Sequence, residues 1–204
     1  MRSYCLATLV AICLSCSVSG CSENPEEAKR KEVIQWVRKC PPAFGVERPS
    51  DWPTPYSSEE EWVNAGRKIE GIENTLSTLC EDNTTDIETT EIIGALSIFA
   101  TADSVPLLIS LAEDKNQSYS VRLDAVCALG RIAHPAATEP LCRIVSSSER
   151  GGDGLMLNAI AALGQIGDPN AIPAIENALK REEHNWVWEK KALTVLEELK
   201  QKRI

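Results

Sequence analysis

Histidine, cysteine, serine and acidic side chains are the groups through which this chain could catalyse a reaction or hold a metal ion. The two histidines, His134 and His184, have no histidine, cysteine or acidic partner at the spacing of metal ligands. The glycine-rich stretch at 150–154 lacks the lysine and hydroxyl residue of a phosphate-binding loop. No serine lies in the turn motif of a catalytic nucleophile with histidine and acidic partners. We therefore expect a protein that is not an enzyme, with no metal, no cofactor and no small-molecule substrate.

The first 21 residues have the layout of a bacterial export signal. Arg2 precedes an apolar stretch from about Leu6 to Leu14, and a run of small residues then ends in Val18-Ser19-Gly20-Cys21. These last four residues resemble the lipobox of bacterial lipoproteins. The resemblance implies that the Cys21 thiolate takes a diacylglyceryl group and that cleavage before Cys21 removes residues 1–20 and leaves Cys21 as the new N-terminus.

Two alternatives remain open for this segment, an uncleaved membrane helix and a secreted protein without lipid. The apolar stretch is about nine residues long, well short of the roughly 20 that span a bilayer. Two or three acyl chains such as palmitate on one cysteine would anchor the protein stably. Ser22, rather than Asp, follows Cys21. Under the lipoprotein resemblance this favours the outer membrane, facing the periplasm, over the inner membrane.

Four cysteines lie in the body of the chain, Cys40, Cys80, Cys127 and Cys142. An even number in an exported protein is compatible with disulfides. Cys40 and Cys80 each end a predicted helix and are the first candidates for a bridge, while Cys127 and Cys142 could also meet within one repeat. Four free, partly buried thiols are the equal alternative.

Composition limits the partners and the fold. The chain is 43% hydrophobic but only 5% aromatic, which favours helices packed through aliphatic side chains. Removing residues 1–20 takes away Arg2 and no acid, so 20 basic and 30 acidic residues leave a charge of about −10. An acidic protein repels phosphate backbones, and we exclude nucleic acid as a partner.

The region before the repeats is predicted to hold two helices. Residues 25–39 place Pro25 in a first turn and space Val33, Ile34 and Val37 on one apolar face. Residues 41–55 contain five prolines and form a loop, so 21–56 is the lipidated N-terminus with a short helix and a proline-rich loop. A long helix at 57–85 should then pack on the following domain, with Trp62 in the core or stacked on a ligand.

Residues 86–204 repeat themselves. The copies read ALSIFATADSVPLL from Ala95, ALGRIAHPAATEPL from Ala128 and ALGQIGDPNAIPAI from Ala162. A period of this length is typical of a stacked solenoid, here with two helices per unit and a proline, Pro106, Pro140 or Pro173, in the first turn of the second helix. A last helix at about 185–201 has a charged outer face and should cap the array.

These units resemble HEAT-like repeats of the phycobilisome-lyase type. The third copy fits best, while the second has one extra residue before Pro140 and the first has Ser97 in place of glycine. The resemblance implies an all-α fold, a short α-solenoid of helical hairpins preceded by a small helical N-terminal region. It also assigns structural roles to the motif residues: Gly130 and Gly164 allow close helix approach, and Arg122 binds turn carbonyls of the neighbouring repeat.

The resemblance further implies that second helices line the surface that binds a partner. Counting three, four and seven residues from each proline gives the expected outward positions, which are Ile109, Ser110, Glu113, Arg143, Ile144, Ser147, Glu176, Asn177 and Lys180. We interpret the chain as a membrane-anchored, non-catalytic module that binds another protein of the bacterial cell envelope. The alternatives are a HEAT-repeat lyase or chaperone-lyase and a structural envelope tether.

Overall fold

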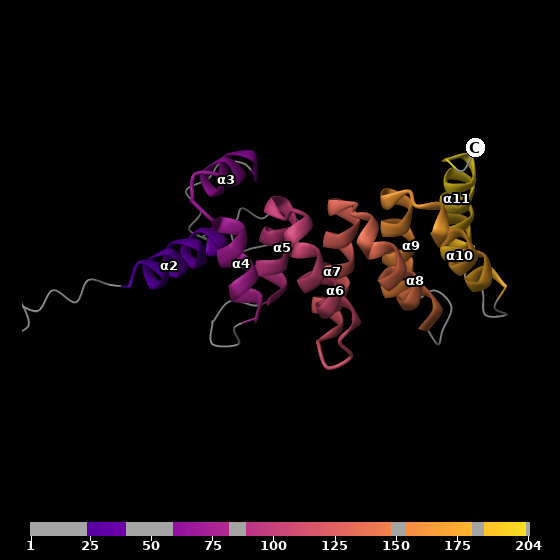
Figure 1. Cartoon of the computed structure of the whole chain (residues 1–204), viewed down its shortest axis with the longest axis horizontal. Coiled ribbons are helices and arrows are strands. Elements are labelled where there is room, and N and C mark those ends of the chain that lie inside the picture. Colours follow the sequence, from indigo (N-terminus) through magenta and orange to yellow (C-terminus); the bar gives the residue numbers. More distant parts are fainter. Residues whose placement is uncertain (1–23, 40–58, 82–88, 148–153, 181–185, 203–204) are drawn as a thin grey trace, which may run out of the picture.

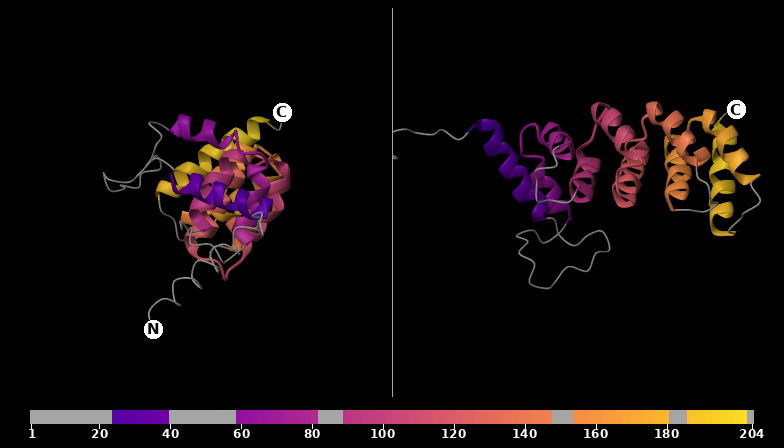
Figure 2. Two further views of the ribbon diagram at one scale, coloured as in Figure 1. Left: turned by 90° about the vertical axis from the view of Figure 1, so that its left-hand side faces the viewer. Right: turned by 90° about the horizontal axis from the view of Figure 1, so that it is seen from below.

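The structure is a computed structural model that describes residues 24–39, 59–81, 89–147, 154–180 and 186–202. Within these ranges every regular element is a helix. The helices follow one another along the long axis of the molecule, with α2 and α3 at one end and α11 at the other (Figure 1). The view from below gives the same succession (Figure 2). The predicted all-α solenoid is confirmed.

The repeats are three helical hairpins, as predicted. Their first helices are stacked in one layer, with α5 against α7 and α7 against α9, and the second helices α6, α8 and α10 form the other layer. The hairpins are α5 (Thr89–Phe99) with α6 (Val105–Glu113), α7 (Tyr119–Ile132) with α8 (Thr138–Ser147), and α9 (Gly154–Ile166) with α10 (Ile172–Leu179). The last helix, α11 (Trp186–Lys202), packs on α9 and α10 and closes the array.

A short 3₁₀ turn joins the two helices of each hairpin, and one residue caps it each time. The turns are η1 (Ala102–Ser104), η2 (Pro135–Ala137) and η3 (Pro169–Ala171). The side chains of Thr101, His134 and Asp168 each accept a hydrogen bond from the amide two residues on, at 3.2, 3.2 and 2.9 Å. His134 Nδ1 therefore serves the turn, as a threonine and an aspartate do in the other repeats.

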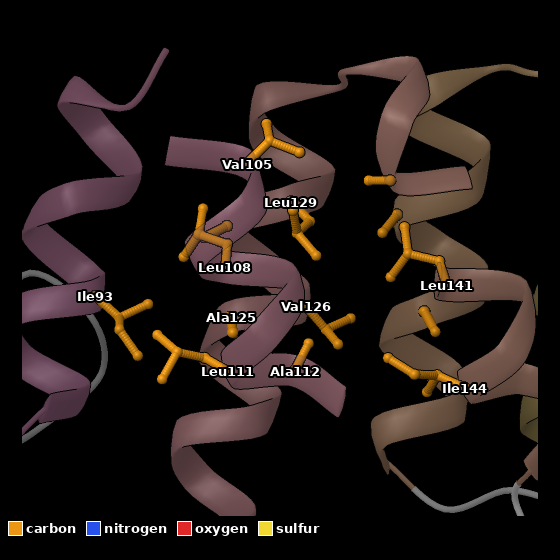
Figure 3. Close-up of a cluster of buried hydrophobic side chains, with 14 of the residues drawn as sticks. Ile93, Val105, Leu108, Leu111, Ala112, Ala125, Val126, Leu129, Leu141 and Ile144 are labelled. Carbon is orange, nitrogen blue, oxygen red and sulfur yellow. The ribbon is translucent and has the colours of Figure 1, made fainter. Parts of the chain in front are cut away.

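Aliphatic side chains fill the space between the layers, as the composition predicts. Leu108 of α6, Leu129 of α7 and Leu141 of α8 are all fully buried and lie in the cluster shown in Figure 3. Two glycines bring neighbouring helices together: a β-carbon on Gly130 of α7 would lie 2.9 Å from Ala162 Cβ of α9, and one on Gly164 of α9 would lie 3.0 Å from Val195 Cγ2 of α11. Both glycines have the predicted role in close helix approach.

The N-terminal region departs from the sequence prediction in one respect. Helix α2 (Pro25–Arg38) is where it was expected, with Asn24 accepting a hydrogen bond from the Glu26 amide as its N-cap. The single long helix predicted from residue 57 is wrong, because the chain forms α3 (Glu59–Gly66) and α4 (Ile72–Glu81) with a turn between them. Gly71 in that turn has a φ of +67°, which glycine adopts at little cost. The proline-rich loop at 41–55 and residues 82–85 lie outside the described residues.

Two tryptophans hold α2 and α3 together. The rings of Trp36 and Trp62 stack with centroids 4.1 Å apart and an angle of 4° between their planes. Each indole N–H donates to the other residue's carbonyl oxygen, Trp36 Nε1 to Trp62 O at 3.0 Å and Trp62 Nε1 to Trp36 O at 2.9 Å. Both side chains are buried and both buried donors are satisfied. Trp62 is a core residue, which was one of its two predicted roles.

Candidate interaction surface

The described part of the chain holds no group of three or more histidine, cysteine, aspartate or glutamate side chains that could bind a metal ion. Cys127 and Cys142 of the second repeat are both free thiols, so the disulfide considered between them does not form. The Cys127 thiol instead donates to Asn158 Oδ1 of the next repeat at 3.4 Å. Burial raises the pKa of both thiols, and nearby carboxylates raise that of Cys142 further, which keeps the nucleophilic thiolate scarce.

Several predicted sites fall outside the described residues. Cys21, the lipid-attachment candidate, and Cys40, one half of the predicted bridge, are among them. The other half, Cys80, is buried on α4, where desolvation and the neighbouring Glu81 raise the pKa of its thiol to about 12. The Cys40–Cys80 bridge therefore stays a prediction.

The predicted outward positions on the second helices are exposed or half-buried with one exception. Ser110, Arg143, Ser147, Asn177 and Lys180 are exposed, and Ile109, Glu113 and Glu176 are half-buried. Ile144 is only 4% exposed and belongs to the core, so its predicted place on the surface is wrong.

The error at Ile144 has a simple structural cause. The second helix begins four residues after the residue that caps the turn, at Val105 after Thr101 and at Thr138 after His134. Pro140 lies one position further into its helix than the other prolines, because of the extra residue before it, and counting from it shifts the second repeat by one. Counting from the cap residue instead gives one consistent set, the second-helix row: Ile109, Ser110, Glu113, Cys142, Arg143, Ser146, Glu176, Asn177 and Lys180.

Ion pairs connect neighbouring helices along this row. Arg143 of α8 binds Glu113 of α6 through Nε at 2.8 Å and Nη2 at 3.2 Å, and it binds Glu139 one turn away at 3.0 Å. Lys200 of α11 binds Glu176 of α10 at 2.8 Å. Two predicted surface residues, Glu113 and Arg143, are thus brought into direct contact. Exposed pairs of this kind contribute little stability, but they neutralise Glu113, Arg143 and Glu176.

Arg122 has the predicted structural role. Its Nε donates to the carbonyl oxygen of Ala112 at 3.1 Å, which is in the last turn of α6 in the preceding repeat. Carbonyls at a helix end have no partner within their own helix, and a guanidinium is well suited to bind them. The contact ties the second hairpin to the first.

One polar contact has no counterpart in the sequence analysis. Glu73 of α4 accepts three hydrogen bonds on Oε1, from the Thr101 amide at 2.9 Å, the Thr101 hydroxyl at 3.0 Å and the Ser104 hydroxyl at 2.6 Å. Desolvation raises the pKa of Glu73, but the hydrogen bonds from Ser104 and Thr101 together outweigh it and leave the pKa below its ordinary value. Periodicity could not reveal this contact, because α4 lies outside the repeats.

No helix in the described ranges is long and apolar enough to cross a membrane. A family model described as PBS lyase HEAT-like repeat matches residues 121–147 and 157–181. The matches fall on the second and third hairpins, which are thus similar to HEAT-like repeats, and the degenerate first hairpin has the same helix–turn–helix fold outside the matched residues. No curated protein matches the chain.

Proposed function

We propose that this protein is a lipid-anchored, non-catalytic module of the bacterial cell envelope that binds another envelope protein through the second-helix row. The observation that carries the proposal is the row itself, a surface repeated in three hairpins of which two match a HEAT-like repeat family. A solenoid presents equivalent positions at regular intervals along one face, which suits an extended protein partner. The lipobox-like end of the first 21 residues supports the anchor.

The exposed side chains favour a partner that is recognised by hydrogen bonds more than by charge. Ser110, Arg143 and Asn177 occupy equivalent positions in the three second helices and are all exposed. Arg143 is engaged by Glu113 and Glu139, which leaves serine and asparagine as neutral donors and acceptors on either side of it. Polar groups of this kind bind extended or irregular backbone without strong steering by charge.

Crosslinking in cells tests the binding surface. A photoreactive amino acid at Ser110 or Asn177 should capture the same envelope protein, because the two positions lie on one row. Matched control positions are Arg131 and Gln165, which are exposed on the first helices. Equal capture from the control positions, or no capture from the row, would contradict the proposed surface.

Intact-mass spectrometry of the membrane fraction tests the anchor separately. The wild-type chain should begin at Cys21 and carry acyl chains, and a Cys21→Ala variant should lack them and leave the membrane. An unmodified or uncleaved N-terminus would refute the lipoprotein assignment without affecting the crosslinking result.

An enzyme related to lyases is the second candidate, because the matched repeat family carries that name. A pigment-handling protein would copurify with a visible absorbance band, and a colourless preparation from a pigment-producing host would argue against it.

A further inference from the structure

Helix α4 occupies the place that the first helix of a preceding repeat would take. It packs on α5 as α5 packs on α7 and α7 on α9, so one layer runs from α4 through to α11 (Figure 1). Its sequence, IENTLSTLCE, has no Ala-Leu-Gly motif, and no second helix like α6 is paired with it in the described residues. The unit formed by α2, α3 and α4, here called the N-terminal cap, therefore ends the solenoid without being a repeat.

The N-terminal cap holds the first repeat by a polar contact at one turn. Glu73 takes three hydrogen bonds from Thr101 and Ser104, which begin and end the connection from α5 to α6. Ser104 is 2% exposed and lies where the other two repeats have alanine, Ala137 and Ala171. The hydroxyl donor is thus present only in the repeat that meets the cap.

An aromatic contact joins the N-terminal cap to the last residue of α5. The edge of Phe99, the last residue of α5, meets the Trp36 ring with centroids 5.4 Å apart and planes at 74°. Gly66 makes room for it, since a β-carbon there would lie 2.5 Å from Trp36 Cζ2 and 2.8 Å from Phe99 Cζ. The positions equivalent to Phe99 are Ile132 and Ile166, which offer no aromatic edge.

The cap also has an internal connection that does not involve the repeats. The stacked and doubly hydrogen-bonded pair of Trp36 and Trp62 joins α2 to α3, and α2 packs on α4 as well. In a linear array each unit contacts only its neighbours, so an end unit can open without unfolding the rest. A unit with its own internal bonds can do so while its own helices stay together.

We propose that the N-terminal cap is a releasable end piece: α2, α3 and α4 detach from α5 as one unit, and Glu73 is the latch that holds them closed. Release uncovers the side of α5 that α4 covers, and with it an apolar end of the solenoid. The latch acts through the turn at Thr101–Ser104, which joins α5 to α6 in the first hairpin. Opening therefore changes the N-terminal end of the solenoid and leaves the second and third hairpins folded.

Hydrogen exchange followed by mass spectrometry on the full chain tests the proposal. A Glu73→Gln variant should accelerate exchange in α2, α3 and α4 by about tenfold or more, because three hydrogen bonds to a carboxylate are weakened together. Exchange in α7 to α10 should change by less than about twofold. The matched control is Glu70→Gln, at an exposed position in the adjoining turn, which should leave all rates unchanged.

The pattern of rates decides between release and simpler explanations. Peptides from α2 and α4 should share one opening rate. Acceleration confined to residues 101–104 would overturn the proposal, because the bond would then be only local. Equal acceleration from α2 to α11 would also overturn it, because cap and repeats would then open as one unit.

A second measurement covers the case in which Glu73→Gln does not fold. In the wild-type chain, low urea concentrations should expose the amides of the cap at a common opening free energy lower than that of α7 and α9. Convergence of cap and repeat amides onto one value would refute a separate opening.

Discussion

Replacing Thr138 by valine should stabilise the protein. Thr138 is the first residue of α8 and is 5% exposed, and its hydroxyl oxygen has no hydrogen-bond partner among the described residues. The equivalent positions in the other repeats are Val105 and Ile172, which are buried at 2% and 5% exposure. An unpaired buried hydroxyl costs about 1–3 kcal/mol, and the valine methyl adds apolar burial in the same volume. We expect the free energy of unfolding to rise by about 1–2 kcal/mol.

Urea and thermal unfolding followed by circular dichroism measure the change. A gain of that size corresponds to an increase in Tm of roughly 2–8 °C for a domain of this length. Thr78→Val is the matched control, since Thr78 is exposed on α4 and its hydroxyl donates to Asn74 O at 2.9 Å. The control should stay within about 0.5 kcal/mol of the wild type. A neutral or destabilising Thr138→Val would mean that the hydroxyl is satisfied in the folded state and that the reasoning is wrong.

Four further substitutions follow from the surroundings of single residues. Hydrogen bonding holds the folded-state pKa of Glu73 below its ordinary value, so the contribution of its carboxylate is present above the unfolded-state pKa and is lost as the pH falls through the folded-state pKa. Glu73→Gln should therefore cost about 1–2 kcal/mol in urea unfolding at pH 7, and this cost should shrink as the pH falls through the folded-state pKa. Gly130→Ala should destabilise by about 1–3 kcal/mol through overlap with the next repeat, whereas Gly94→Ala, with no atom within 4 Å of the new carbon, should stabilise by about 0.5–1 kcal/mol. Arg122→Met should cost about 1–2 kcal/mol by leaving the Ala112 carbonyl without its donor, and unchanged unfolding would show that water replaces the guanidinium there.

The repeats were predictable because their sequence signals are redundant. Each hairpin combines an apolar period, a turn and a proline near the start of the second helix, and the three copies support one another. The role of Arg122 also followed from the repeat pattern. Where a copy departs from the pattern the prediction failed: the extra residue before Pro140 shifted the surface count and placed the buried Ile144 outside.

The N-terminal region was less predictable because its contacts are specific rather than periodic. The apolar spacing from Trp62 to Leu79 continues through the turn, so a single helix fitted it as well as two. The two glycines Gly66 and Gly71 were the only signals for a break, because glycine weakens a helix interior. In the structure Gly66 lies close to Trp36 and Gly71 has a positive φ. Stacking of tryptophans 26 residues apart leaves no mark in the sequence beyond the residues themselves.

The capping helix shows the same limit on a smaller scale. The sequence indicated its amphipathic character, and Ala192, Val195 and Leu199 are buried as expected for the face on α9 and α10. Leu193 is 45% exposed, although its Ala-Leu pair matches the pairs whose leucines are buried in the repeats. In a repeat both sides of the first helix are covered by neighbours, whereas nothing in the described residues packs on the outer side of α11.

The two ends of the solenoid are therefore closed by different physical means. At the C-terminal end a charged outer face on one long helix keeps the last repeat soluble, and Lys200 binds back to Glu176 of α10. At the N-terminal end buried tryptophans join α2 to α3, α2 packs on α4, and α4 is attached to the first repeat by packing on α5 and through the carboxylate of Glu73. Helix α4 also packs along α5, but the three hydrogen bonds that Glu73 accepts all come from one turn, so a single substitution weakens them together. This difference is why we place the releasable element at the N-terminal end and why Glu73→Gln is the substitution that separates cap from repeats.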